Sequence, residues 1–354
     1  MKELGSITRR EMLGVIASSA LLTSCDNDGY AYEPVTLPGS VTSVRPYKGR
    51  PQFFIGDGPY GKPVFETYVP QEKYFRQFAE AGTDVFCYST NLGAGFGAPV
   101  WLGPDSWDFS ALDEIAHRIL SVNPNALIMP RIYLTAPDWW VQANPQECQV
   151  LSEGGTVYKL GVGHRRDGAA FPSLASEKWR METAAALKHL IRHIQESDYG
   201  EHLFGYMITG LMSEEWYHWS IHTEQLSDYS AHAAAAFAVW LQKKYGSEAE
   251  LQKAWNTPQV DFSSVTVPSK ELRCRNRDRI FRDPATEMQV IDWYLFYNEL
   301  VPDTMEVFLR AAKEACDHRK VVGAFYCYMF EFGGDPEYGH NALGKLLQSP
   351  HLDF

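Results

Sequence analysis

Two adjacent acids, Glu214 and Glu215, stand where an apolar run ends and an aromatic cluster begins. The run, residues 203–208, has the length of a strand, and residues 216–219 contribute three aromatic side chains. Parallel α/β folds place their active sites at the carboxyl ends of strands. Aromatic neighbours raise the pKa of a carboxyl group by desolvation and offer flat faces to a sugar ring. The pattern therefore predicts a carboxylic acid that protonates the leaving oxygen in glycoside cleavage. The alternative is a surface pair that starts a helix.

A second apolar run, residues 126–133, also ends in a polar and aromatic turn. Arg131 and Tyr133 alternate with apolar residues in it, and Trp139 and Trp140 follow. Residues at alternate positions of a strand share a face. We therefore expect Arg131 and Tyr133 to point into one pocket and Trp139 to wall it. The alternative for one of the two tryptophans is packing in the core or against a helix.

A third run, residues 321–328, places Tyr326 and Tyr328 on one face by the same period of two. Glu331 follows it, and a carboxylate in such a loop reaches a site or is simply solvated. The side chains expected to shape a sugar pocket are Arg131, Tyr133, Trp139, Trp216, Tyr326 and Tyr328. This chemistry needs no cofactor.

Other motifs are weaker. His189 with His193, and His218 with His222, stand four residues apart, a spacing that suits zinc on a helix face. Neither pair contains the glutamate of His-Glu-x-x-His, so we interpret them as packing or surface residues and expect no metal. The glycine-rich residues 93–97 lack the lysine of a nucleotide loop and are interpreted as a flexible active-site loop.

The N-terminal segment, residues 1–24, has the features of an export signal. Arg9 and Arg10 precede an apolar stretch too short to span a bilayer comfortably, and residues 22–25 read Leu-Thr-Ser-Cys. The arginine pair resembles a twin-arginine signal, and the last four residues resemble the lipobox of bacterial lipoproteins. We expect lipid attachment at Cys25 and anchoring to a bacterial membrane on the periplasmic or outer side. The alternative is an ordinary cleaved signal with a chance cysteine.

The rest of the chain predicts an α/β fold. Residues 25–45 lack periodicity and are interpreted as a tether, and residues 46–354 as a single domain without repeats. Short apolar runs alternate there with amphipathic helices, which is typical of a parallel sheet. Helices are expected after Ser176, over residues 229–245, and after Asp283. The predicted strands are residues 52–55, 84–88, 126–133, 203–208 and 321–328.

Composition excludes some partners. The 354 residues include 32 Lys and Arg against 44 Asp and Glu, for a net charge of -12, so a basic face for nucleic acid is not expected. The 10 Trp and 19 Tyr suit sugar binding, although large cores also use them. The least periodic stretch, residues 257–282, contains five arginines: Arg273, Arg275, Arg277, Arg279 and Arg282. We interpret this stretch as a solvated insertion loop, with binding of acidic glycans as the alternative.

Residues 108–145 carry a family resemblance. The segments Asp108-Phe109-Ser110-Ala111-Leu112-Asp113, Ala136-Pro137-Asp138-Trp139-Trp140 and Asn144-Pro145 resemble the region around the third barrel strand of glycoside hydrolase family 42, the β-galactosidase family of clan A. The resemblance implies a (β/α)8 barrel whose acid/base glutamate follows strand four, where residues 213–217 stand. Glu214 replaces the asparagine of the family's Asn-Glu pair. We therefore assign the acid to Glu215 and keep Glu214 as the alternative.

The resemblance also implies a missing part. About five of the eight barrel strands are recognisable, and residues 351–354 look like the start of a sixth. The family's nucleophilic glutamate follows strand seven and would lie beyond Phe354. We expect the complete protein to cleave β-linked, galactose-containing glycans by a retaining two-carboxylate mechanism, and this truncated barrel to have little or no activity. The alternative is a noncatalytic surface lipoprotein that binds an oligo- or polysaccharide.

Overall fold

The computed structural model describes residues 39–160, 164, 166–220, 223, 225–275, 281–328 and 334–354. Several predictions concern residues outside these ranges: the export signal, lipid attachment at Cys25, the tether up to residue 38, and the roles of His222, Arg277, Arg279 and Glu331. The described part of the chain contains no helix that is both long and apolar enough to cross a membrane.

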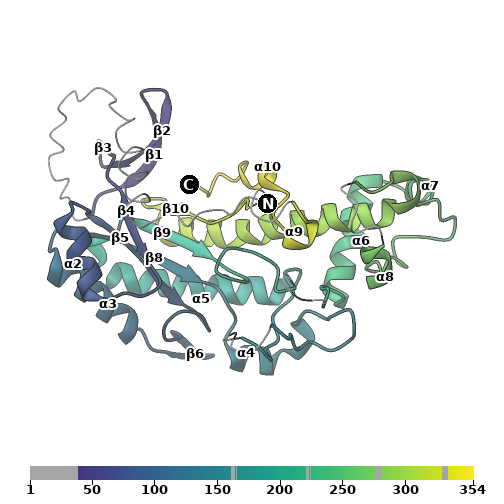
Figure 1. Cartoon of the computed structure of the whole chain (residues 1–354), viewed down its shortest axis with the longest axis horizontal. Helices are drawn as coiled ribbons and strands as arrows, with labels where there is room; N and C mark the ends of the chain where they lie inside the picture. Colours follow the sequence, from purple (N-terminus) through teal and green to yellow (C-terminus); the bar gives the residue numbers. More distant parts are fainter. Residues whose placement is uncertain are drawn as a thin grey trace, which may run out of the picture. The chain divides into compact units, whose positions relative to one another are not determined.

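The centre of the fold is a parallel sheet of five strands (Figure 1). In chain order they are β4 (Val64–Thr67), β5 (Val85–Asn91), β8 (Leu127–Tyr133), β9 (Gly205–Thr209) and β10 (Val321–Gly323). Each strand pairs with the next one in this order, so the sheet reads β10-β9-β8-β5-β4. Every residue of β5, β8 and β9 is buried, as expected for strands covered on both faces. The prediction of an α/β fold with consecutive barrel strands is confirmed.

Helices connect the strands and cover the sheet. They are α2 (Glu72–Glu80), α3 (Ser110–Val122), α5 (Glu177–Glu196) and α9 (Pro284–Ala315). Figure 1 shows α2, α3 and α5 along one side of the sheet, and α5 packs along α9. The Oγ atom of Ser176 accepts a hydrogen bond from the backbone of Trp179 and caps α5, as predicted. The ring of Trp179 then meets Phe308 of α9 edge-on, with 5.3 Å between centroids.

Shorter helices extend the loops at the carboxyl ends of β8, β9 and β10. They are α4 (Asp138–Ala143), α6 (Ala231–Tyr245), α7 (Glu248–Trp255), α8 (Lys270–Cys274) and α10 (Leu343–Leu346), with 3₁₀ turns η1 (Pro145–Glu147) and η3 (Pro336–Tyr338). A further 3₁₀ turn, η2 (Gly200–His202), leads from α5 into the amino end of β9. Gly246 ends α6 at φ 72°, in the left-handed region that favours glycine. Ser247 caps α7 by accepting a hydrogen bond from the backbone N–H of Glu250.

The prediction for the first barrel strand is wrong. Residues 52–55 belong to β2 (Arg50–Ile55) of an antiparallel sheet with β1 (Thr42–Tyr47) and β3 (Gly58–Tyr60). The connection at Lys48 and Gly49 has positive φ angles of 49° and 80°, which suits a two-residue hairpin. The tether therefore does not extend to residue 45, because β1 begins at Thr42, and the barrel strands begin only at β4.

The last predicted strand is shorter than expected. β10 ends at Gly323 rather than at residue 328, and Cys327 has φ 76°, which is incompatible with extended backbone. Asp353 donates its backbone N–H to the carbonyl of Val322 at 2.8 Å. Ala324 donates to the carbonyl of Phe354 at 3.2 Å. Residues 353 and 354 therefore lie along β10, where the next strand of a barrel would run.

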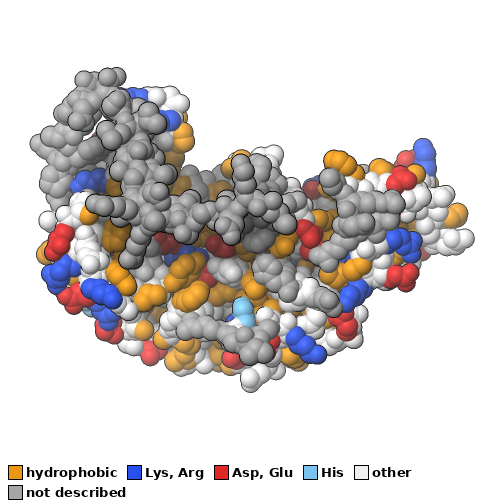
Figure 2. All heavy atoms as spheres, in the orientation of Figure 1, with side chains coloured by type: hydrophobic (Ala, Val, Ile, Leu, Met, Phe, Trp, Pro, Cys, Tyr) orange, Lys and Arg blue, Asp and Glu red, His pale blue; other side chains and the backbone are white. Residues whose placement is uncertain are grey.

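The interpretation of the arginine-rich stretch as solvated is wrong for two of its residues. Arg273 is fully buried and pairs with Glu337 at 2.6 Å. Arg282 pairs with Glu287 at 2.9 Å, and both side chains are mostly buried. These charges are neutralised inside the protein, because a buried ion needs a partner. On the face drawn in Figure 2, acidic and basic side chains are interspersed around the border.

A small hairpin of β6 (Trp101–Gly103) and β7 (Ser106–Trp107) completes the strands of the described residues.

Candidate active site

Arg131 lies between two carboxylates at the carboxyl ends of the strands. It sits on β8 with 2% of its side chain exposed, and its Nε is 2.8 Å from Oε2 of Glu214. Its Nη1 donates to Oε1 of Glu66 at 2.5 Å, and its Nη2 donates to the hydroxyl of Tyr68 at 2.5 Å. The rings of Tyr68 and Phe325 lie 4.3 and 4.6 Å from the guanidinium carbon. The guanidinium thus joins the ends of β4, β8 and the loop after β9.

Glu214 is a buried carboxyl group whose pKa is raised. It has no exposed surface, and Ser89 Oγ donates to its Oε2 at 3.3 Å. Burial raises the pKa of Glu214 to about 7, because the desolvation penalty exceeds the attraction of Arg131. The nearby charge of Glu66 acts in the same direction. One cation serves two carboxylates here, so a proton on Glu214 relieves the excess negative charge.

The loop that carries the two glutamates has a strained backbone. Leu211, Ser213, Glu214 and Trp216 have φ angles between 56° and 64°, a region that non-glycine residues rarely occupy. Such strain persists only where the surroundings hold it, and it concentrates at functional sites. Here Tyr133, which is buried, donates its hydroxyl to the carbonyl of Leu211 at 2.5 Å. Tyr133 therefore supports the loop from β8.

Trp216 does not wall a sugar pocket. Its side chain is fully buried, its Nε1 donates to the carbonyl of Ile208 at 3.1 Å, and its ring stacks on Phe308 with 6.2 Å between centroids. Its backbone N–H donates to the carbonyl of Gly210 at 2.8 Å. The prediction of a sugar-contacting role is wrong, because the left-handed turn directs this ring back into the core beneath the loop.

Glu215 occupies a different environment from its neighbour. It is partly exposed, and the hydroxyl of Tyr328 donates to its Oε1 at 3.2 Å. Tyr328 packs on Tyr217 with 5.3 Å between ring centroids. His340 stacks on the same Tyr217 ring at 4.3 Å with an interplanar angle of 14°. An accessible carboxyl with an aromatic surround is the environment predicted for the acid, and Tyr328 lies beside it as expected.

Two other predicted pocket residues have different positions. Tyr326 donates its hydroxyl to the carbonyl of Gly339 at 2.8 Å and, like Tyr328, packs on His340, with 4.6 Å between ring centroids. Tyr326 thus belongs to the aromatic cluster beside Glu215. Trp139 donates its Nε1 to the carbonyl of Trp101 at 3.1 Å and belongs to a separate hollow described below, so its assignment to the site at Glu215 is wrong. Trp140 is buried, in accord with the packing alternative for one of the two tryptophans.

Sequence reasoning missed Glu66, Tyr68 and Ser89. The first two residues stand at the end of β4, a strand of four residues that lies between Pro63 and Pro70. A β-branched and aromatic run bounded by prolines is a strand signal, and Glu66 and Tyr68 are two residues apart on one face. Pairing of β4 with the fully buried β5 brings them to Arg131.

The histidines and the glycine-rich loop are packing features. His193 lies 2.9 Å from Asp113 and stacks on Phe109, and His189 lies against Trp107. Within the described ranges, no group of three or more His, Cys, Asp or Glu side chains is placed to hold a metal ion. A Cβ atom at Gly95 would lie 2.3 Å from the side chain of Asn91. Glycine is therefore required there for the loop after β5 to pack against the site.

Comparison with known proteins then decides the family. The model of glycoside hydrolase family 42, described as β-galactosidase, matches residues 87–336, more than half of the chain and including both glutamates. The chain belongs to glycoside hydrolase family 42. A search of curated proteins found no match to this family-42 chain.

Solved structures show the same fold. A β-galactosidase from Halorubrum lacusprofundi aligns with a TM-score of 0.52 at 19% identity, over 75% of this chain and 36% of its own. A β-galactosidase from Marinomonas ef1 gives 0.54 at 15%, over 75% and 37%. The catalytic domain of a β-amylase from Paenibacillus polymyxa gives 0.58 at 15%, over 81% and 73%. The family-42 chain thus spans just over a third of the length of these two β-galactosidases.

Proposed function

We propose that this chain carries the acid half of a glycoside hydrolase that cleaves β-galactosides. The observation that carries the proposal is the carboxyl pair after β9, the fourth strand of the parallel sheet, in a chain of the β-galactosidase family. In barrels of this type the active site is built from the loops at the carboxyl ends of the strands. The Arg131 cluster and Glu215 both lie at that edge.

Glu215 is the proposed general acid. It is partly exposed, so a glycosidic oxygen can approach it, whereas Glu214 is covered on all sides. A general acid must reach the atom that it protonates, and this geometric requirement precedes the match of pKa values. Glu215 would deliver its proton to the leaving oxygen as the bond from that oxygen to the anomeric carbon breaks. Glu214, through Arg131, would position the loop beneath the acid.

A retaining reaction also requires a nucleophilic carboxylate about 5–5.5 Å from the acid. The family resemblance places that glutamate after strand seven of the barrel. The five-stranded parallel sheet of the described residues includes the fourth strand, so we assign only the acid side of the reaction to these residues.

Substrates with different leaving groups test the proposal. Glu215→Gln and its unsubstituted parent, each in a form of the enzyme that carries the strand-seven nucleophile, should be compared on lactose and on 2,4-dinitrophenyl β-D-galactoside. The dinitrophenolate leaves without a proton, so the variant should lose cleavage of lactose while still releasing dinitrophenolate. Added azide should then yield β-galactosyl azide, because an anion needs no general base to attack the glycosyl-enzyme. Equal loss on both substrates would contradict the role of acid.

Glu214→Gln is the matched comparison at the neighbouring residue. If Glu214→Gln shows the leaving-group dependence and Glu215→Gln does not, the roles of the two glutamates are reversed. An unsubstituted enzyme that carries the strand-seven nucleophile and binds lactose but hydrolyses neither substrate would overturn the enzymatic proposal and favour noncatalytic glycan binding.

We also propose that the protein is exported and attached to a membrane through lipid at Cys25. The proposal rests on the basic, apolar and Leu-Thr-Ser-Cys order of residues 9–25. Intact mass measurement of the protein from its native membrane should show a diacylglyceryl cysteine, and Cys25→Ala should move the protein out of the membrane fraction. An unmodified Cys25 in the mature protein would refute the anchor.

A further inference from the structure

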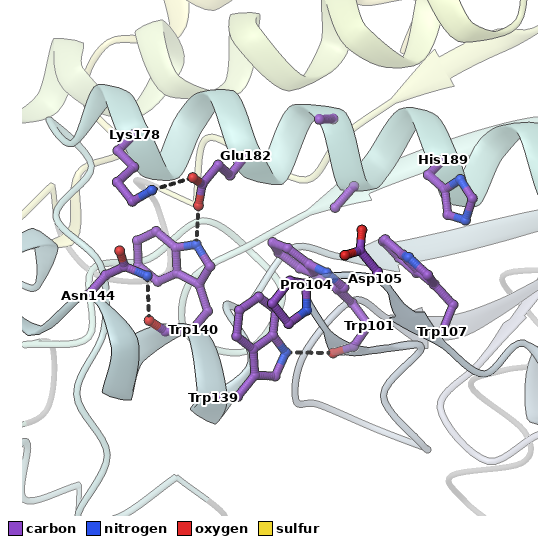
Figure 3. Close-up of a pocket in the computed structure, with 12 residues that line it drawn as sticks. Trp101, Pro104, Asp105, Trp107, Trp139, Trp140, Asn144, Lys178, Glu182 and His189 are labelled. Atoms are coloured by element: carbon purple, nitrogen blue, oxygen red, sulfur yellow. Dashed lines mark hydrogen bonds and ion pairs between the residues drawn. The ribbon is translucent and has the colours of Figure 1, made fainter.

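A second hollow lies outside the carboxylate site, between the β6–β7 hairpin, α4 and α5 (Figure 3). Its volume is about 590 Å³, within the range of sites for small molecules. None of the residues around Arg131 lines it. The hollow therefore requires an explanation separate from the proposed reaction.

Tryptophans form its walls. The rings of Trp101 and Trp107 lie 5.8 Å apart with an interplanar angle of 10°, and Trp139 stands perpendicular to Trp101 at 5.0 Å. The hydrogen bond from Trp139 Nε1 to the carbonyl of Trp101 fixes this corner. Trp107 and Trp139 are partly exposed, so the rigid corner offers indole surface to a ligand.

Two small residues leave space on the helix side of the hollow, between the larger Glu182 and His189. Ala185 and Ala186 of α5 stand opposite the tryptophans, where longer side chains would fill the space. Polar groups also line it: Glu182 accepts hydrogen bonds from Lys178 and from Trp140 Nε1, and these contacts hold its carboxylate in place. A flat apolar wall beside fixed polar groups suits a sugar ring. The C–H bonds on one face of the ring can stack on an indole, and the hydroxyls at the ring's edge can hydrogen-bond to the polar groups.

We infer that this hollow is a second carbohydrate site that binds a neutral pyranose unit of a glycan. The apolar face of the ring stacks on Trp139, beside the edge of Trp107, and its hydroxyls bond to Glu182 and to the exposed Asp105 at the rim. A neutral ligand is favoured because the acidic Glu182 is already paired with Lys178, which leaves no net positive charge to select an anion. The choice of a galactoside as the probe rests on the proposed function.

The test is ¹⁹F NMR on the full chain labelled with 5-fluorotryptophan, titrated with β-1,4-galactobiose. Resonances are assigned with Trp107→Phe and Trp139→Phe, and Glu215→Gln is used as the background so that no sugar is consumed. The resonances of Trp107 and Trp139 should shift with the sugar. Ala185→Met should weaken this binding at least tenfold, because the longer side chain fills the hollow without disfavouring the helix.

Ala235→Met on the exposed side of α6 is the matched control, and it should leave the titration unchanged. Resonances that stay fixed in the sugar titration, or shift equally in Ala185→Met, overturn the inference, as does a shift with choline but not with sugar. Failure of the unsubstituted enzyme with its strand-seven nucleophile to hydrolyse lactose, with the shifts intact, contradicts only the proposed enzymatic function. Hydrolysis without these shifts contradicts only the second site.

Discussion

The buried carboxyl of Glu214 should make the stability of the protein fall as the pH rises. The pKa of Glu214 is about 7 in the folded protein against 4.5 in an unfolded chain. Between these values the folded protein binds one more proton than the unfolded protein. The free energy of unfolding therefore decreases by about 1.4 kcal/mol per pH unit from this group. The stabilisation is complete below pH 4.5 and is lost as the pH rises through 7.

The full change follows from the shift in pKa. An increase in the pKa from 4.5 to about 7 lowers the free energy of unfolding by about 3 kcal/mol between pH 4.5 and pH 8. Glu214→Gln keeps the shape of the side chain but cannot ionise, and Arg131 then pairs with Glu66 alone. The stability of wild type minus that of Glu214→Gln should therefore fall by about 3 kcal/mol over this pH range.

Urea unfolding followed by tryptophan fluorescence, at several pH values between 4.5 and 8, measures the difference. Other titrating groups are common to both proteins, so they cancel in the subtraction. Glu215→Gln is the control, and the difference attributable to Glu214 should persist in it. If the stabilities of wild type and Glu214→Gln run parallel across the whole range, the carboxyl at 214 does not carry this proton and the assignment of its pKa is refuted.

Three other substitutions should have measurable effects. Trp216→Ala should lower the free energy of unfolding by about 3–5 kcal/mol, measured in urea, because it empties a fully buried site; a loss below 1 kcal/mol would indicate that the ring does not anchor the loop. Arg273→Met should destabilise by about 3–5 kcal/mol by leaving Glu337 charged and buried, and adding Glu337→Gln should restore much of that loss. No recovery in the double variant would argue against the ion pair. Burial lowers the pKa of His218 to about 3, so the free energy of unfolding falls as the pH drops below 6.5. His218→Phe should reduce this loss of stability by about 1.4 kcal/mol per pH unit. If the dependence of the melting temperature on pH between 4 and 6 is the same in wild type and variant, this prediction is contradicted.

Much of the architecture follows from local pattern. Mostly apolar runs identify β5, β8 and β9, and serine or aspartate caps identify α5 and α9, because period and capping depend on residues close in sequence. The same logic fails for β2 and β4. An apolar run cannot tell which sheet it will join, and that choice depends on pairing between distant segments.

The site divides in the same way. The sequence alone identified the two glutamates, Arg131 and Tyr328 as candidate site residues on or after strands, and it showed a resemblance to glycoside hydrolase family 42. Only the tertiary structure separated the glutamates into a buried and an accessible carboxyl, because a left-handed turn sends successive side chains to different environments. It also turned Trp216 into the core and moved Trp139 to a second hollow, since an aromatic side chain binds a ligand only where the surrounding packing leaves its face uncovered.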